Sequence, residues 1–174
     1  MSFKAEVKAS LGWNWNDGAV DNNRLDFAVA LPGGNGEGQA EAVWHVEDQT
    51  LLDATSIIFD LTELSRTVFG DTVTVTFLTV KALLIVNRST DGGELVVGNA
   101  PADWWSEPFG ADGDRVIVPP DSPLLLANRQ EGWDVDNASR NLQLAAIGGD
   151  VTYSMAIVGT TTAPGSGSGS GSGA

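Results

Sequence analysis

Residues 3–9 read FKAEVKA, and in this stretch every odd-numbered residue is apolar and every even-numbered one is charged. A period of two places the two sets of side chains on opposite faces of a β-strand, so the stretch predicts a strand with one solvent-exposed face. Since an isolated strand is not stable in water, we expect residues 3–9 to pair within the chain or with a neighbouring subunit. The same period recurs at Leu25, Phe27, Val29 and Leu31 and, within residues 72–79, at Val73, Val75 and Phe77.

Short apolar runs separated by turn-forming residues make up most of the remaining chain. Glycine, proline and aspartate punctuate it at intervals typical of strand-turn-strand sequences, as in Pro32-Gly33-Gly34. The one helical spacing falls within residues 61–69, where Leu61, Leu64 and Val68 share a face. The runs that we predict as strands are residues 81–87, 94–97, 115–118, 123–127, 133–135, 141–147 and 151–158.

These patterns predict an all-β fold. We expect an antiparallel β-sandwich, jelly-roll-like, or a barrel of about ten strands, with at most one short helix near residues 61–69. A chain of 174 residues is long enough for one domain with its own core, and we assign residues 1–163 to it. Residues 164–174 form a tail that alternates glycine and serine, which predicts a flexible linker or a fusion scar.

Composition excludes several classes of function. Nine basic and 23 acidic side chains give a net charge of −14, which repels nucleic-acid backbones and anionic membrane surfaces. The absence of cysteine removes disulfides, thiol nucleophiles and thiolate metal sites. Because the apolar runs are too short for a membrane helix and residues 1–10 have no apolar signal core, we expect a soluble protein without a secretion signal.

No residue pattern predicts a catalytic, cofactor-binding or metal site. His45 is the single histidine and lies in the strand-like run 42–46, without a Gly-x-Ser-x-Gly motif, so we expect no catalysis to depend on it. Asp112/Asp114 and Asp134/Asp136 have the alternating acids of calcium loops but lack the glycine and glutamate of an EF-hand. We favour local turn hydrogen bonds as the explanation of both acid pairs, and calcium stays the alternative.

Six tryptophans are the remaining distinctive feature of the composition. Two lie in GWNWNDG (residues 12–18) and two in PADWWSEP (residues 101–108), among turn-forming residues, so we predict that these four lie in loops. Loop tryptophans plug the end of a sandwich, anchor a protein interface or stack on sugars, and all three roles stay open here.

Several stretches, in this order, are KALLIVNRST (residues 81–90), LVVG (95–98), VIVPP (116–120), GWDV (132–135) and TYSMAIVGT (152–160). Over residues 43–160 this order resembles a family of small β-rich virion proteins of tailed bacteriophages and prophages. The resemblance implies a structural particle component, in particular a head decoration (cement) protein, and brings no catalytic residues. It leaves head, tail and fibre open as locations.

We therefore expect a non-enzymatic virion structural protein, made in the bacterial cytoplasm and assembled on the capsid surface. Its expected partners are a major capsid protein and copies of itself, as a homotrimer, because closed cyclic oligomers cover strand edges. No nucleic acid, membrane or small-molecule substrate is expected. The alternatives are a glycan-binding β-sandwich module, a tail or fibre component that uses exposed loop tryptophans, and a small hydrolytic protein. The predicted interface residues are Trp13, Trp15, Trp104, Trp105, Phe3 and Val7.

Overall fold

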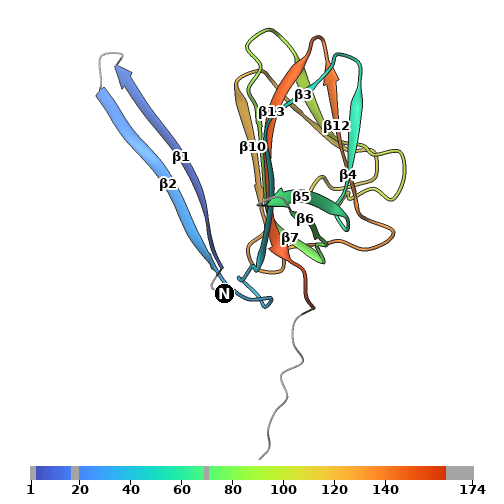
Figure 1. The fold of residues 1–174 in the computed structure, drawn as a ribbon. Coiled ribbons are helices and arrows are strands. Elements are labelled where there is room, and N and C mark those ends of the chain that lie inside the picture. Colours follow the sequence, from blue (N-terminus) through green and yellow to red (C-terminus); the bar gives the residue numbers. More distant parts are fainter. Residues whose placement is uncertain (1–2, 17–19, 69–70, 164–174) are drawn as a thin grey trace, which may run out of the picture.

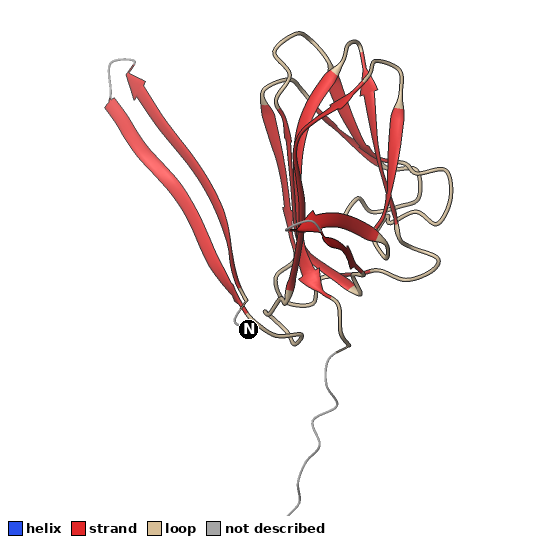
Figure 2. Cartoon of the chain, in the orientation of Figure 1, coloured by secondary structure: helices blue, strands red, loops and turns tan. Residues whose placement is uncertain are grey.

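Strands and the loops between them account for the whole described chain (Figure 2). The computed structural model describes residues 3–16, 20–68 and 71–163; the predicted glycine/serine tail lies outside these ranges. No helix long and apolar enough to cross a membrane is found in the described part of the chain. The strands are β1 (Lys4–Asn16), β2 (Val20–Pro32), β3 (Ala42–Leu51), β4 (Ser56–Asp60), β5 (Leu64–Val68), β6 (Asp71–Val75), β7 (Thr79–Asn87), β8 (Glu94–Gly98), β9 (Arg115–Val118), β10 (Ser122–Ala127), β11 (Trp133–Asp134), β12 (Asn141–Ile147) and β13 (Val151–Thr160).

Two antiparallel sheets pack face to face (Figure 1). One sheet has the order β10-β7-β13-β3, with β11 also paired to β7; we call it the arm-side sheet, because the hairpin of β1 and β2, described below as the arm, packs on it. The other, the far sheet, has the order β4-β12-β8-β9. Alternate residues of each strand point inward, as the period-two pattern requires. The antiparallel β-sandwich is confirmed, and no barrel closes among the described strands. Fully buried side chains at the centre of the core include Phe77, Leu83, Ile85, Leu95, Leu144 and Ile157.

The short helix allowed near residues 61–69 is not formed in the described part of that segment. Residues 61–63 make a turn, and β5 then pairs antiparallel with β6. Thr67 and Val68 are β-branched and prefer a strand, which outweighs the weak helical spacing of the three apolar residues. Phe69, the last residue of the predicted helix, lies outside the described residues.

β1 and β2 form a long hairpin, the arm (residues 4–32), which lies outside the two sheets (Figure 1). Its register runs without a shift from the pair Lys4↔Pro32 to the pair Asn16↔Val20. The predicted pairing of residues 3–9 is confirmed, and the partner strand belongs to the same chain.

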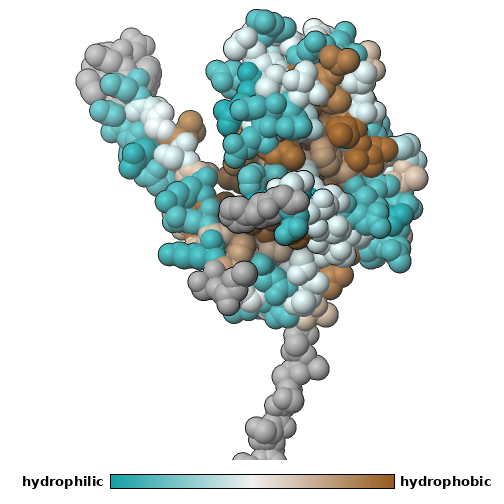
Figure 3. Space-filling model, viewed as in Figure 1, coloured by the Kyte–Doolittle hydropathy of each residue, from teal (hydrophilic) through white to brown (hydrophobic). Residues whose placement is uncertain are grey.

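The base of the arm packs on the outer face of the arm-side sheet. Val7 and Leu31, of which Leu31 is completely buried, form a second apolar cluster with Ala82 of β7. Leu125 of β10 and Val158 of β13 pack against this cluster. Beyond its base the arm leaves the sheet and stands clear of the body (Figures 1 and 3).

Candidate functional site

The arm has one apolar face and one polar face. Directly opposed residues of an antiparallel pair point to the same side of the ladder. The apolar face therefore carries the opposed pairs Val7↔Val29, Ala9↔Phe27 and Leu11↔Leu25 in succession, and Trp13 continues it toward the tip.

Only the lower part of this apolar face is covered. Val7 and Leu31 are buried at the base, whereas Phe27 is 56% exposed and Leu11 and Leu25 are each 68% exposed. Apolar side chains that gather on one exposed face make that face a candidate surface for interaction with another protein.

The polar face of the arm behaves as a solvated surface. Ser10 Oγ donates a hydrogen bond of 2.6 Å to Asp26 Oδ1, and Arg24 Nε lies 2.7 Å from Asp26 Oδ2. These exposed polar groups satisfy one another in water. The two faces of the arm are thus chemically distinct, and only the apolar face gains from being covered.

The outer face of the arm-side sheet is also apolar. The register places Leu125, Leu84, Ala156 and His45 in one row across β10, β7, β13 and β3. Leu84 is 39% exposed and Val43 is 37% exposed. β7 has buried side chains on its inner side and apolar side chains on its outer side, so most of its residues are apolar. Such a run is unusual in a sheet that has one face in water.

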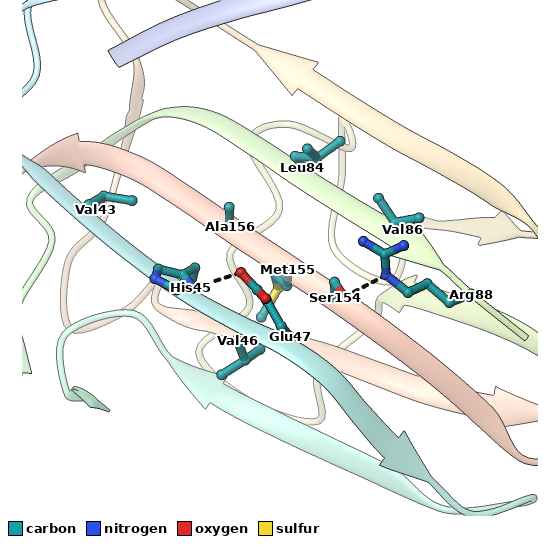
Figure 4. A pocket seen from close by; sticks show the side chains of 10 residues that line it. All are labelled: Val43, His45, Val46, Glu47, Leu84, Val86, Arg88, Ser154, Met155 and Ala156. Atoms are coloured by element: carbon teal, nitrogen blue, oxygen red, sulfur yellow. Dashed lines mark hydrogen bonds and ion pairs between the residues drawn. The ribbon is translucent and has the colours of Figure 1, made fainter. Parts of the chain in front are cut away.

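Two shallow grooves on this outer face join into one surface. The first lies beside the base of the arm and includes Val7 and Leu125, and the second lies over β3, β7 and β13 and includes Val43 (Figure 4). Leu84 and Ala156 line both. We call this continuous surface, from the arm base to β3, the sheet groove.

Polar and charged groups at the rim of the sheet groove contact one another (Figure 4). His45 Nδ1 lies 3.7 Å from Glu47 Oε1 (Figure 4). Arg88 Nε lies 3.3 Å from Asp48 Oδ1. Arg88 Nε also donates to Ser154 Oγ over 2.9 Å. This arrangement leaves an apolar floor between polar groups that already have partners, which suits the binding of apolar side chains.

A buried lysine fixes the loop that touches the root of the arm. Lys81 Nζ donates to the carbonyl oxygens of Gln130 and Glu131, at 2.8 and 2.6 Å. Burial lowers the pKa of Lys81, and the negative charges of Glu37, Asp134 and Glu131 oppose that shift. Arg129, in the same loop, donates through Nε to the carbonyl of Ala30 in β2 at 3.4 Å. The loop thus ties the arm root to the body.

The predicted interface tryptophans fall into different environments. Trp13 and Trp15 lie on β1, not in a loop as predicted, because the strand continues to Asn16 before the chain turns back. Trp13 is 39% exposed, and the side chain of Trp15 lies outside the described part. Phe3 packs partly buried at the arm base beside Val7.

Trp105 belongs to the core. It is 2% exposed, its Nε1 donates to the carbonyl of Asp134 at 3.0 Å, and its ring makes edge-to-face contacts with Phe109 and Trp133. Trp104 is partly buried beside it. Within this chain Trp105 therefore plugs the sandwich and presents no surface for a partner.

One carboxylate of each acid pair accepts local turn hydrogen bonds. Asp114 Oδ2 accepts from the backbone of Ala111 at 3.0 Å, and Asp136 Oδ1 accepts from Ala138 and Ser139 at 2.7 and 2.9 Å. The described residues contain no group of three or more acids and histidine close enough to hold a metal ion.

Sequence reasoning did not single out Leu11, Leu25, Phe27 or Leu84 as exposed apolar residues. The period of two placed Leu25 and Phe27 on one face of a strand, and it did not show whether another layer of the fold covers that face. Whether a third layer covers a strand is a property of the tertiary fold, and a local alternation carries no signal for it.

No family model, curated protein or solved structure matches the chain. The resemblance to phage virion proteins thus stays a prediction, and function is inferred from the two exposed apolar surfaces.

Proposed function

We propose that this chain is a non-enzymatic structural protein of a tailed-phage virion that attaches to the outside of the head and stabilises it. The observation that carries the proposal is the arm, on which Leu11, Leu25 and Phe27 stay exposed on one face. Such a face is unfavourable in water and becomes favourable once another protein covers it. The order of strand motifs supports a virion as the assembly.

Reach and charge suit this role. Thirteen extended residues in each strand span roughly 40 Å, and over this length the arm diverges from the side of the sandwich (Figure 1). The net charge of −14 supports a position on the outer surface of the shell, away from packed DNA. A protein that binds the assembled shell and not its free subunits stabilises the shell by mass action.

The test uses phage particles purified from a lysate of the bacterial host. Mass spectrometry of these particles should detect the chain, and particles stripped of it by mild denaturant should bind the recombinant full chain again in co-sedimentation. The double variant Leu11→Asp/Leu25→Asp should bind at least about tenfold more weakly, since it loses two apolar contacts, whether these join the chain to the shell or join the copies that attach to it together. The matched control Asn14→Asp/Ala28→Asp adds the same charge to the polar face and should bind as the unmodified chain does.

Absence of the chain from the particles would overturn the proposal. Equal binding of both double variants to stripped particles would show that attachment does not depend on the apolar face of the arm, which also contradicts the proposal.

Glycan binding is a second candidate, favoured by one groove near the arm tip. Trp13 and Asn23 border it from the apolar face of the arm, and Asn14, Asn22 and Arg24 border it from the polar face, so that an indole ring, amides and a guanidinium group lie around it. This combination suits the stacking and hydrogen bonding that sugars need. Retention of the chain on immobilised oligosaccharides, lost in Trp13→Ala, would support this candidate against attachment to a capsid.

A further inference from the structure

We infer that the exposed part of the arm docks in the sheet groove of a second copy of this chain, so that neighbouring subunits exchange arms. This inference rests on the proposed function, because it names how copies of the decoration protein bind one another. The occupant of the groove is the apolar face of the arm at Leu11, Leu25 and Phe27.

The contact already formed within one chain shows the packing chemistry. Val7 and Leu31 of the arm lie on Ala82, with Leu125 and Val158 beside them. Both apolar surfaces, that of the arm and that of the sheet, extend beyond this contact. The arm continues with the same apolar face, and the sheet continues with the same apolar groove.

The distal arm and the sheet groove are both exposed, because the arm diverges from the sheet beyond its base. The outer arm residues Leu11 and Leu25 and the groove residues Leu84 and Val43 are all more than one third exposed. The distal arm stands apart from the sheet while its base touches it (Figure 3). One chain therefore presents two matching apolar surfaces that it does not bring together.

Closure of the arm onto its own sheet would require a bend that the arm is not built to make. Bends in antiparallel ladders occur at bulges, and the arm has an unbroken register along its described length. Its root is held by buried Leu31 and by Gly33, where an added Cβ would lie 2.9 Å from the carbonyl oxygen of Phe3. An arm from a second copy reaches the groove with no such bend.

Charge favours the arm as the part that approaches another copy. Residues 3–33 contain three basic and four acidic side chains, a net charge of −1, so −13 of the total −14 lies on the rest of the chain. Direct contact between two bodies would bring two strongly acidic surfaces together. An almost neutral arm avoids most of this repulsion.

Symmetry gives the form of the assembly. The arm and the sheet groove are different surfaces, so the contact is heterologous, and heterologous contacts close into rings when the rotation allows it. In a closed ring every copy donates one arm and accepts one arm. A trimer of this kind matches a local three-fold position of a capsid, and it leaves neither surface exposed.

The chain has no native cysteine, so engineered cysteines report the contact directly. One set of full-length chains carries a single cysteine on the arm, at Leu11, Leu25 or Phe27. A second set, labelled with ¹⁵N, carries a single cysteine in the groove, at Val43, Leu84 or Val86. Each pair is mixed, left to exchange subunits, oxidised and analysed by mass spectrometry.

Arm exchange predicts disulfide-linked chains of mixed label for at least one pair. The control Ala28→Cys places the cysteine on the opposite face of the arm, beside Phe27 in the chain. It should yield at least about tenfold less mixed-label disulfide, because a disulfide requires Cβ atoms within about 4.5 Å. Mixed disulfides from no pair, or equal yields from Ala28→Cys, would overturn the inference. A dilute double variant Leu25→Cys/Leu84→Cys that forms only an intrachain bond would also overturn it, in favour of closure onto the chain's own sheet.

The experiments distinguish a failure of the proposed virion function from a failure of arm exchange. Mixed disulfides together with absence of the chain from particles would leave arm exchange standing and remove the virion function. Presence of the chain in particles with the arm cysteines linked to the capsid protein, and not to a second copy, would keep the function and remove arm exchange.

Discussion

Asn87 is completely buried at the end of β7, and its amide joins the two sheets. Nδ2 donates to the carbonyl oxygens of Gly93 and Val118 at 2.9 and 3.0 Å, and Oδ1 accepts from the backbone of Ser89 at 3.0 Å. Asn87→Ala leaves these buried groups without partners, so we expect a loss of about 2–4 kcal/mol in the free energy of unfolding by urea. The exposed Asn137→Ala should change it by less than about 0.5 kcal/mol; equal effects of the two variants would contradict the bridging role.

Glu41 holds the end of the described chain through one carboxylate oxygen. Oε1 accepts from the backbone and hydroxyl groups of Thr161 and Thr162, at distances from 2.7 to 3.1 Å. The hydrogen bond from the Thr162 hydroxyl, with the other three, lowers the pKa of Glu41, although burial opposes the shift. The anchoring is therefore complete above the ordinary glutamate pKa and is lost as the pH falls through the lowered one.

Hydrogen exchange at the amides of Thr161 and Thr162 measures this anchoring. After correction for intrinsic rates, we expect their protection to fall below a pH of about 4.3, the ordinary pKa of a glutamate. Glu41→Gln removes the charge, so it should weaken protection at neutral pH and abolish this acid step. An acid step of the same size in Glu41→Gln would show that another group causes it.

Among the elements, β13 lies at the centre of the arm-side sheet, and its register to β7 shifts between Val158 and Gly159. A Cβ at Gly159 would collide with the carbonyl oxygen of Thr79 and lie 2.9 Å from Phe77 Cδ1. Gly159→Ala should therefore lower the free energy of unfolding by about 2–3 kcal/mol. Gly12→Ala in β1 meets no atom closer than 3.7 Å and should change it by less than about 1 kcal/mol. A Gly159→Ala protein as stable as the control would show that the sheet relaxes at this shift.

The arm is an element with its own anchor, and Leu31 is the residue that tests it. Leu31 is completely buried against Val7 and Ala82, so Leu31→Ala removes packing worth about 2–5 kcal/mol at a fully buried site. Because the sandwich core is a separate cluster, we expect faster hydrogen exchange in β1 and β2 and unchanged exchange in β7 and β13. Uniformly faster exchange throughout the chain would mean that the arm and the sandwich unfold as one unit.

For the whole molecule, the sequence predicted well where the strands lie along the chain and predicted poorly how they pack. The predicted runs 115–118 and 141–147 coincide with β9 and β12, and the alternation of residues 3–9 correctly predicted a paired strand. Such patterns depend on local sterics and on which face is apolar, and both can be read along a chain. β4 was missed, because its five residues have no clear alternation.

The candidate site could be predicted only in part. Val7, Phe3 and Trp105 were predicted at an interface with another protein, but in this chain Val7 and Phe3 pack where the arm meets the sheet and Trp105 lies in the core. Apolar residues on a strand are equally compatible with a core and with an exposed docking face. The divergence of the arm from the sheet decides between them, and it arises from packing between residues more than fifty positions apart.

The central claim is that this chain is a subunit that assembles through the apolar face of its arm, and sedimentation velocity of the free full-length protein tests it most directly. The unmodified chain and the control Asn14→Asp/Ala28→Asp should sediment as a trimer that dissociates on dilution. Leu11→Asp/Leu25→Asp should sediment as a folded monomer, with the circular dichroism spectrum of the unmodified chain. An unmodified chain that stays monomeric up to its solubility limit, or a Leu11→Asp/Leu25→Asp variant that associates as strongly as the control, would contradict the claim.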